Sequence, residues 1–299
     1  MLSLLRRLVK WMIPHGLYLR FDKETIDGDA ARAKYYSAGR LPFAPGYHQA
    51  KMRWVADSIM DVKLEKTFLG GPDLPANFGT LFDERVVEYP WVFAHLGNSP
   101  GPRLLDIGPA LNHLELVTIL KARVPKISIT MVSPGPETNC FYGMGVGYAI
   151  EDARDLPFSN ERFDQVTCIS TLEHIGMDTS EYGGPKEMAP RDYLKAWSEM
   201  RRVLTRGGSM LVTVPFGFHQ KPGGAHQQFN DEMVGELIKA FDPSEFTLDL
   251  YRYTSIGWVH SDPESCLDAT YNSTIAGDLD YYESHPVRAE AVACLKLVK

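Results

Sequence analysis

The residues whose types could support chemistry gather at the ends of short apolar runs. The first such group is Asp106-Ile107-Gly108, which closes one run and directly precedes a helical pattern. In sheets built from alternating strands and helices, ligands bind at the carboxyl ends of the strands. Gly108 would let the backbone approach a ligand closely, and the following helix would offer unpaired amides. This corner is therefore a candidate binding site for a polar ligand.

The same stretch argues against two common kinds of nucleotide site. A dinucleotide fingerprint needs three spaced glycines, and those positions hold Gly108, Ala110 and His113. The sequence also has no GxxxxGK phosphate-binding loop. NAD and ATP are therefore poor ligand candidates.

An ordered series of short motifs follows this first group. In chain order it reads Asp152-Ala153, Leu156-Pro157-Phe158, Phe163-Asp164, Ser170-Thr171-Leu172-Glu173-His174, Arg202-Val203-Leu204 and Gly207-Gly208. The series resembles that of the class I S-adenosylmethionine-dependent methyltransferases, especially their small-molecule members. The resemblance covers about residues 101–255. It implies S-adenosyl-L-methionine as the cofactor and a doubly wound, Rossmann-like sheet of seven strands.

The resemblance implies cofactor-binding roles at the matching positions. Asp106 and Gly108 would hold the methionine end of the cofactor. Asp152, with Ala153 beside it, would accept a hydrogen bond from the adenine amino group. The strand end at Ser170-Thr171 would border the cavity in which the methyl group is transferred.

Three positions of the implied cofactor site depart from the family. Ala110 and Asn112 stand where the family has glycines, and asparagine is a plausible substitute because it tolerates left-handed backbone. Ser133 replaces the acidic residue that grips both ribose hydroxyls, and one hydroxyl cannot copy a carboxylate. Glu137 is a candidate to compensate. The stretch at 133–145 also leaves little room for the usual helix.

Methyl transfer to an alcohol requires a group that removes the hydroxyl proton. The candidates at the mouth of the sheet are Glu173, His174 and Asp178, followed by His219 and His226 in a glycine-rich loop. Structural packing of His174 and an exposed loop around the other two histidines are the alternatives. A divalent metal held by His219 with Asp178 or Glu173 is conceivable, but the spacing is not diagnostic, so we assign no metal ligand.

Short apolar runs alternate with helical patterns around these residues, which favours an α/β, doubly wound fold. Strands are predicted at 103–107, 127–132, 146–151, 164–170, 209–214, 246–253 and 291–298, and helices at 47–62, 83–96, 111–122, 192–204 and 231–241. Pro90 should kink or break its helix, and Arg206-Gly207-Gly208 should cap the helix before it. The segment 83–91 is a candidate to line the acceptor pocket.

The chain divides into three parts by pattern. Residues 1–20 form an amphipathic N-terminal helix, 21–100 a helical extension or substrate cap, and 101–299 the methyltransferase core with an insertion at 260–288. In the first part Leu4, Leu8 and Trp11 share an apolar face opposite Arg6 and Lys10. Such a helix can lie in the interface of an anionic membrane. Docking on the protein's own core is the alternative.

Composition limits the partners and the compartment. The 299 residues carry a formal net charge of −7, with 44% hydrophobic and 23% charged residues, which is typical of a soluble globular protein. The acidic balance argues against nucleic acid as the main partner, and no apolar run is long enough to span a bilayer. Four scattered cysteines indicate a reducing compartment. We expect the cytoplasm, with the inner face of the membrane as a possible position.

The resemblance implies a methyltransferase. By analogy, the N-terminal helix and the aromatic insertion favour O-methylation of a sugar of a bacterial surface glycan or lipid-linked precursor, in polysaccharide biosynthesis. Tyr271, Asn272, Tyr281 and Tyr282 in the insertion would suit a polar ring. One alternative is a methyltransferase acting on a soluble metabolite. Another is a non-catalytic binding or scaffold subunit of the same fold, which Ser133 and the altered glycine loop favour. The sequence leaves the oligomeric state open.

Overall fold

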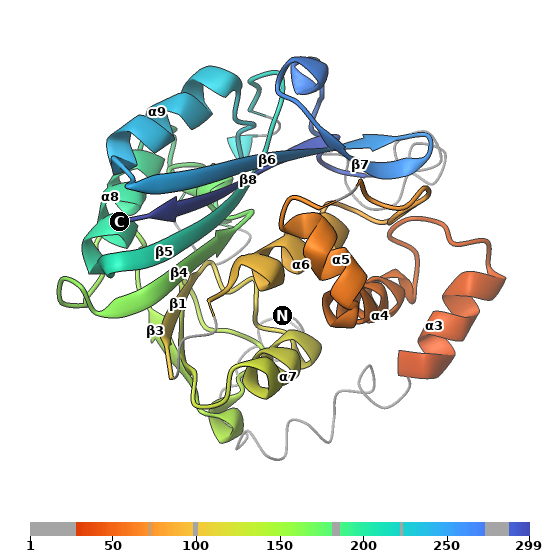
Figure 1. Cartoon of the computed structure of the whole chain (residues 1–299), viewed down its shortest axis with the longest axis horizontal. Coiled ribbons are helices and arrows are strands. Elements are labelled where there is room, and N and C mark those ends of the chain that lie inside the picture. Colours follow the sequence, from red (N-terminus) through yellow and green to blue (C-terminus); the bar gives the residue numbers. More distant parts are fainter. Residues whose placement is uncertain (1–27, 72, 98–100, 181–185, 222–223, 273–286) are drawn as a thin grey trace, which may run out of the picture.

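A computed structural model of the chain describes residues 28–71, 73–97, 101–180, 186–221, 224–272 and 287–299. The predicted helix at 1–20 lies outside these residues, as do Tyr281 and Tyr282. A central β-sheet with helices on both faces forms the body of the molecule (Figure 1). The α/β, doubly wound fold class is thus confirmed.

The sheet has eight strands among the described residues, in the order β3-β2-β1-β4-β5-β8-β6-β7. Their bounds are β1 Arg103–Ile107, β2 Ser128–Ser133, β3 Val146–Ile150, β4 Phe163–Ile169, β5 Leu204–Pro215, β6 Glu245–Thr254, β7 Gly257–Ser261 and β8 Ala291–Val298. The first five strands pair in parallel, and β8 is antiparallel to both β5 and β6. The strand that the sequence did not predict is β7, a hairpin partner of β6.

The order of the strands places a binding crevice beside β1. Chain order proceeds outward from β1 through β2 and β3, then resumes on the other side of β1 with β4. At such a topological switch point the loops after adjacent strands separate, and this leaves a crevice at their carboxyl ends. Gly108, Ser133 and Ser170 therefore come to one edge of the sheet.

Helices cover both faces of the sheet (Figure 1). The described α-helices are α3 Gly28–Ser37, α4 Tyr47–Met60, α5 Val62–Phe68, α6 Arg85–His95, α7 Leu114–Arg123, α8 Tyr193–Val203 and α9 Asp231–Phe241. Buried residues of α4 to α7 share one hydrophobic core with one face of the sheet, and those of α8 and α9 share a second core with the other face. The extension before β1 thus packs directly on the sheet.

Three local expectations differ from the structure. The helix predicted at 47–62 divides at Asp61, whose side chain caps α5 by accepting from the Lys63 amide at 2.8 Å. Helix α6 continues through the buried Pro90 instead of breaking there. Helix α8 ends at Val203 without a glycine cap, because the Gly207 amide pairs with the Lys299 carbonyl at the end of the sheet.

The chain after β2 contains only one short 3₁₀ turn, η1 Tyr142–Met144, before β3. The sequence correctly predicted little room for a helix there. Separately, none of the described helices is both long and apolar enough to cross a membrane.

Candidate active site

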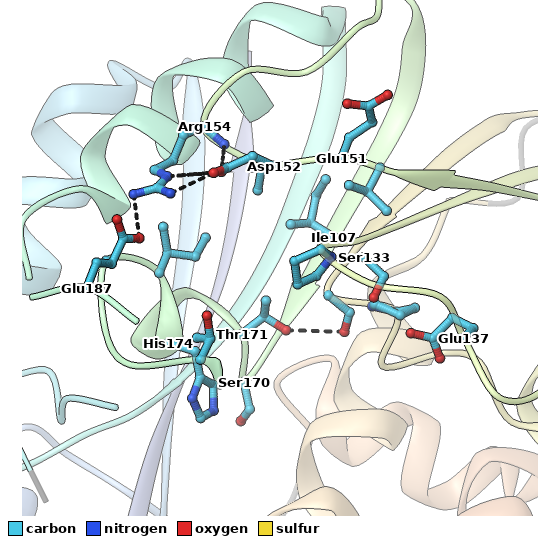
Figure 2. A pocket seen from close by; sticks show the side chains of 18 of the residues that line it. Ile107, Ser133, Glu137, Glu151, Asp152, Arg154, Ser170, Thr171, His174 and Glu187 are labelled. Atoms are coloured by element: carbon cyan, nitrogen blue, oxygen red, sulfur yellow. Dashed lines mark hydrogen bonds and ion pairs between the residues drawn. The ribbon is translucent and has the colours of Figure 1, made fainter. Parts of the chain in front are cut away.

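A cavity of about 400 Å³ lies at the carboxyl ends of β1, β2, β3 and β4 (Figure 2). This volume falls within the usual range for small-molecule sites. Most of the cavity wall is formed by residues at the ends of the four strands and in the loops that follow them. Arg85 of α6 and Glu187 complete the wall. Six of the nine predicted cofactor residues line it, namely Gly108, Ser133, Asp152, Ala153, Ser170 and Thr171.

Gly108 allows a tight turn at the end of β1. Its φ of 72° lies in the left-handed region, and its amide donates to the Val132 carbonyl at 2.9 Å. A Cβ atom on this residue would lie 2.1 Å from Cγ2 of Thr171. Only glycine therefore lets the turn lie against the end of β4.

Asp106 and Ala110 hold this loop in place but do not line the cavity. Asp106 is fully buried, and its carboxylate accepts from the Leu111 amide at 2.9 Å and from the Thr167 hydroxyl at 2.7 Å. Burial raises the pKa of Asp106 to about 7, although both hydrogen bonds oppose this shift. The Ala110 carbonyl accepts from the Tyr89 hydroxyl at 2.9 Å. In this structure Asp106 shapes the loop, and its contact with the methionine end of the cofactor stays a prediction.

Asn112 also lies outside the cavity lining, but it orients a residue that belongs to it. Its side-chain Nδ2 donates to Glu137 Oε2 at 3.1 Å and to the Asn139 carbonyl at 2.8 Å. Its side-chain Oδ1 accepts from the Tyr148 hydroxyl at 2.8 Å. The backbone of Asn112 is not left-handed, so conformational tolerance does not explain the asparagine. Its side chain instead holds Glu137, which lines the cavity with Ser133.

The loop after β3 contains an ion-pair network that the sequence did not reveal. Arg154 donates to the Asp152 carboxylate at 2.6 Å and also pairs with Glu187 at 2.7 Å and Asp192 at 3.0 Å (Figure 2). Hydrogen bonds from Arg154 lower the pKa of Asp152. Asp152 is therefore ionised at neutral pH and fixed at the edge of the cavity.

Helix α6 is joined to the end of β4 by a buried carboxylate. Glu88 is fully buried and accepts from the Ser170 hydroxyl at 2.6 Å and the Thr213 hydroxyl at 2.7 Å. Its other oxygen pairs with Arg85 at 2.5 Å, and Arg85 lines the cavity. Ser170 itself has a left-handed φ of 37°. The sequence indicated segment 83–91 as a candidate lining of the acceptor pocket. It did not single out Glu88, because the two hydroxyl partners of Glu88 lie 82 and 125 residues away along the chain.

His174 is the predicted catalytic residue that lines the cavity. It lies in the 3₁₀ turn η2 Leu172–His174, and its Nδ1 is 2.9 Å from the Ala225 carbonyl oxygen. A carbonyl oxygen only accepts hydrogen bonds, so Nδ1 carries the proton and Nε2 carries the lone pair. Burial lowers the pKa of His174 below its usual 6.5. The ring is thus neutral at physiological pH and able to accept a proton.

The other three predicted catalytic residues do not line the cavity. Burial raises the pKa of Glu173 well above its usual value and so favours its protonated form. Asp178 accepts from the Ser180 hydroxyl at 2.6 Å, and His219 Nδ1 lies 2.7 Å from the Gln228 carbonyl. Within the described part of the chain, no three His, Cys, Asp or Glu side chains are grouped as a metal site would need. The conceivable metal site at His219 therefore has no structural support.

Comparison with known proteins shows which protein family the residues around this cavity resemble. Residues 126–212 match the family model of a methyltransferase domain, and they include Asp152, Ser170 and His174. Residues 126–212 therefore carry a methyltransferase domain, as the motif series predicts. S-adenosyl-L-methionine is the cofactor that the motif series implies for such a domain.

Other similarities to the methyltransferase domain are short or distant. An uncharacterized protein of Methanocaldococcus jannaschii is 37% identical over 59 residues, which span 20% of this chain and 19% of that protein. A possible histamine N-methyltransferase from Thermotoga maritima is 16% identical, with 67% of this chain and 84% of that chain covered and a TM-score of 0.40. A Haemonchus contortus phosphoethanolamine N-methyltransferase 2 in complex with S-adenosyl-L-methionine is 18% identical, with 67% and 49% covered and a TM-score of 0.41.

Proposed function

We propose that this chain transfers the methyl group of S-adenosylmethionine to a hydroxyl group of a polar acceptor. The observation that carries the proposal is the single cavity that has Asp152 on one side and the neutral His174 on the other (Figure 2). One side offers groups for a nucleoside, and the opposite side offers a base for an alcohol. The cofactor supplies an electrophilic methyl group when it is bound.

The lining residues fit the polar groups of this cofactor. The turn at Gly108 admits close backbone approach, and Arg85 offers a cation for the carboxylate of the methionine end. Ser133 and Glu137 would bind the ribose hydroxyls. Asp152 would accept from the adenine amino group beside Ala153. The carboxylate, the ribose hydroxyls and the adenine amino group of the cofactor thus each have a group of matching chemistry in the cavity wall.

His174 would act as the general base. Its Nε2 would take the proton that the acceptor hydroxyl loses when its oxygen receives the methyl group from the cofactor sulfur, which would leave as S-adenosylhomocysteine. The Ala225 carbonyl, which accepts from Nδ1, stabilises the positive charge that the ring then carries. The Glu88 contact holds Ser170 beside this position, so the rigid end of β4 limits the approach of the acceptor.

The acceptor that we propose is a sugar of a bacterial surface glycan or of a lipid-linked precursor. The basic amphipathic pattern at 1–20 would hold the enzyme at the anionic membrane, where lipid-linked precursors lie. We expect the full chain to sediment with anionic phospholipid vesicles. A form without residues 1–20 should stay in the supernatant and keep its cofactor affinity. Equal sedimentation of both forms would contradict the membrane part of the proposal.

Calorimetric titration with S-adenosylmethionine and S-adenosylhomocysteine tests the cofactor part. We expect saturable micromolar binding that Gly108→Ala abolishes, because the added Cβ atom forces the turn away from Thr171. Gly147→Ala is the matched control, since a Cβ atom there meets its neighbours at an ordinary 3.7 Å. Absence of binding by the folded wild-type protein would favour the non-catalytic scaffold instead.

A further inference from the structure

A group of buried polar side chains lies next to His174 and outside the lining of the cofactor cavity. We call it the acceptor-side cluster, and it consists of the buried Glu84, Glu173 and His226 together with the partly buried Tyr271. Glu173 is 1% exposed and His226 is 8% exposed. None of the steps described above uses these side chains.

The cluster is assembled from four segments. The Gln227 amide donates to the Glu173 carbonyl at 3.0 Å, which ties the loop of His226 to the turn after β4. The ring of His226 lies 4.2 Å from that of Tyr271 and 5.6 Å from that of His174. Tyr271 forms a β-bridge with Ala289, whose amide donates to Glu84 at 3.4 Å. The cluster therefore adjoins the proposed base through the ring of His226.

Two atoms of the cluster lack hydrogen-bond partners among the described residues. They are Oε2 of Glu173 and Nε2 of His226, and both are shielded from solvent. Buried polar atoms are nearly always paired in folded proteins, because an unpaired one has lost its water without a replacement. Two such atoms beside a proposed base indicate that a ligand supplies the missing partners.

The protonation of the cluster indicates which chemical group fits. Burial raises the pKa of Glu173 well above its usual value and lowers that of His226 to about 4. Burial thus favours the protonated, donating form of Glu173, and the ring of His226 is uncharged at neutral pH. A hydroxyl group both donates and accepts, so it can pair with either. A hydroxyl group needs no charge on either partner, whereas an ammonium or phosphate group would lose its hydration here without an opposite charge at these two atoms.

We infer that the acceptor-side cluster binds a second hydroxyl of the acceptor, next to the hydroxyl that His174 deprotonates, so that the acceptor is a polyol such as a sugar ring. This inference rests on the proposed methyl transfer and assigns side chains that would bind its acceptor. A mono-alcohol would leave both buried atoms unpaired. The cluster thereby selects for neighbouring hydroxyls rather than for size alone.

Ligand-observed NMR titration tests the inference without turnover. The full chain, saturated with S-adenosylhomocysteine, is titrated with the methyl pyranosides of glucose, galactose and mannose and with cyclohexanol. We expect at least one pyranoside to bind ten times more tightly than cyclohexanol. Glu173→Leu and His226→Phe should each weaken that binding about tenfold. Glu173→Gln should retain it within about twofold, because an amide resembles a protonated carboxyl.

The matched control is His219→Phe, which alters a histidine of the same glycine-rich loop whose Nδ1 pairs with Gln228. This variant should keep the wild-type affinity for the sugar. All variants should keep their affinity for S-adenosylhomocysteine, which shows that they are folded. If no pyranoside binds, or if Glu173→Leu and His226→Phe bind as wild type, the inference is overturned while the cofactor function stands. If S-adenosylhomocysteine itself does not bind, the proposed function fails.

Discussion

Replacement of His174 by asparagine is expected to lower kcat by about 10²–10⁴-fold, the usual contribution of a general base. The asparagine amide can still donate to the Ala225 carbonyl in place of Nδ1, but no lone pair remains at the position of Nε2. Affinity for S-adenosylhomocysteine should change by less than about threefold. The measurement is single-turnover methyl transfer to a sugar acceptor, followed by mass spectrometry.

The pH dependence of kcat gives a second test of His174. Because burial lowers the pKa of His174 below 6.5, the ring stays neutral at pH 7. We expect kcat to be constant around neutral pH and to fall as pH drops through that lowered pKa, since the protonated ring cannot accept a proton. His174→Asn should lose this acidic limb. A variant that keeps the limb would assign the base to another group.

The second large effect is expected at Glu137. Glu137→Gln should weaken binding of S-adenosylhomocysteine about 10- to 100-fold, because hydrogen bonds to a charged group contribute about 1.5–3 kcal/mol. The same factor is expected for 5′-methylthioadenosine, which keeps the ribose but lacks the amino-acid part. Calorimetric titration of both ligands measures the two losses.

Two further variants show whether Glu137 acts through its position. Asn112→Ala should lose part of the same affinity, because the amide that holds Glu137 Oε2 is removed. Glu151→Gln is the matched control, since Glu151 is a cavity-lining carboxylate for which we propose no ligand contact, and it should stay within about threefold of wild type. A loss for S-adenosylhomocysteine alone would place Glu137 at the amino-acid end instead of the ribose.

The strands and the Gly108 turn could be read from the sequence because their signals are local. The apolar runs at 103–107 and 291–298 match β1 and β8 residue for residue, and Asp231 to Phe241 matches α9. Strand β7 was missed, since Gly257–Ser261 is short and mixes buried with exposed positions. The motif series identified the family because its spacing is fixed along the chain.

The chemistry inside the site depended on contacts between distant segments. Glu88 reaches Ser170 across 82 residues, and Glu137 meets Asn112 across 25. Neither pairing produces a periodic pattern in the sequence. The motif that contains Asp106 also does not determine whether its side chain lines the cavity or bonds to the loop. Tertiary contacts also set which groups ionise: burial raises the pKa of Asp106, whereas hydrogen bonds from Arg154 lower that of Asp152.

The amino-acid sequence by itself thus determined the fold class, the resemblance to methyltransferases and the edge of the sheet where the cavity lies. These follow from local periodicity and from strand order, which a linear pattern encodes. Only the tertiary structure decided that His174, and not Glu173 or His219, lines the cavity. The direction of a side chain and the solvent around it depend on packing between segments that are far apart in the chain.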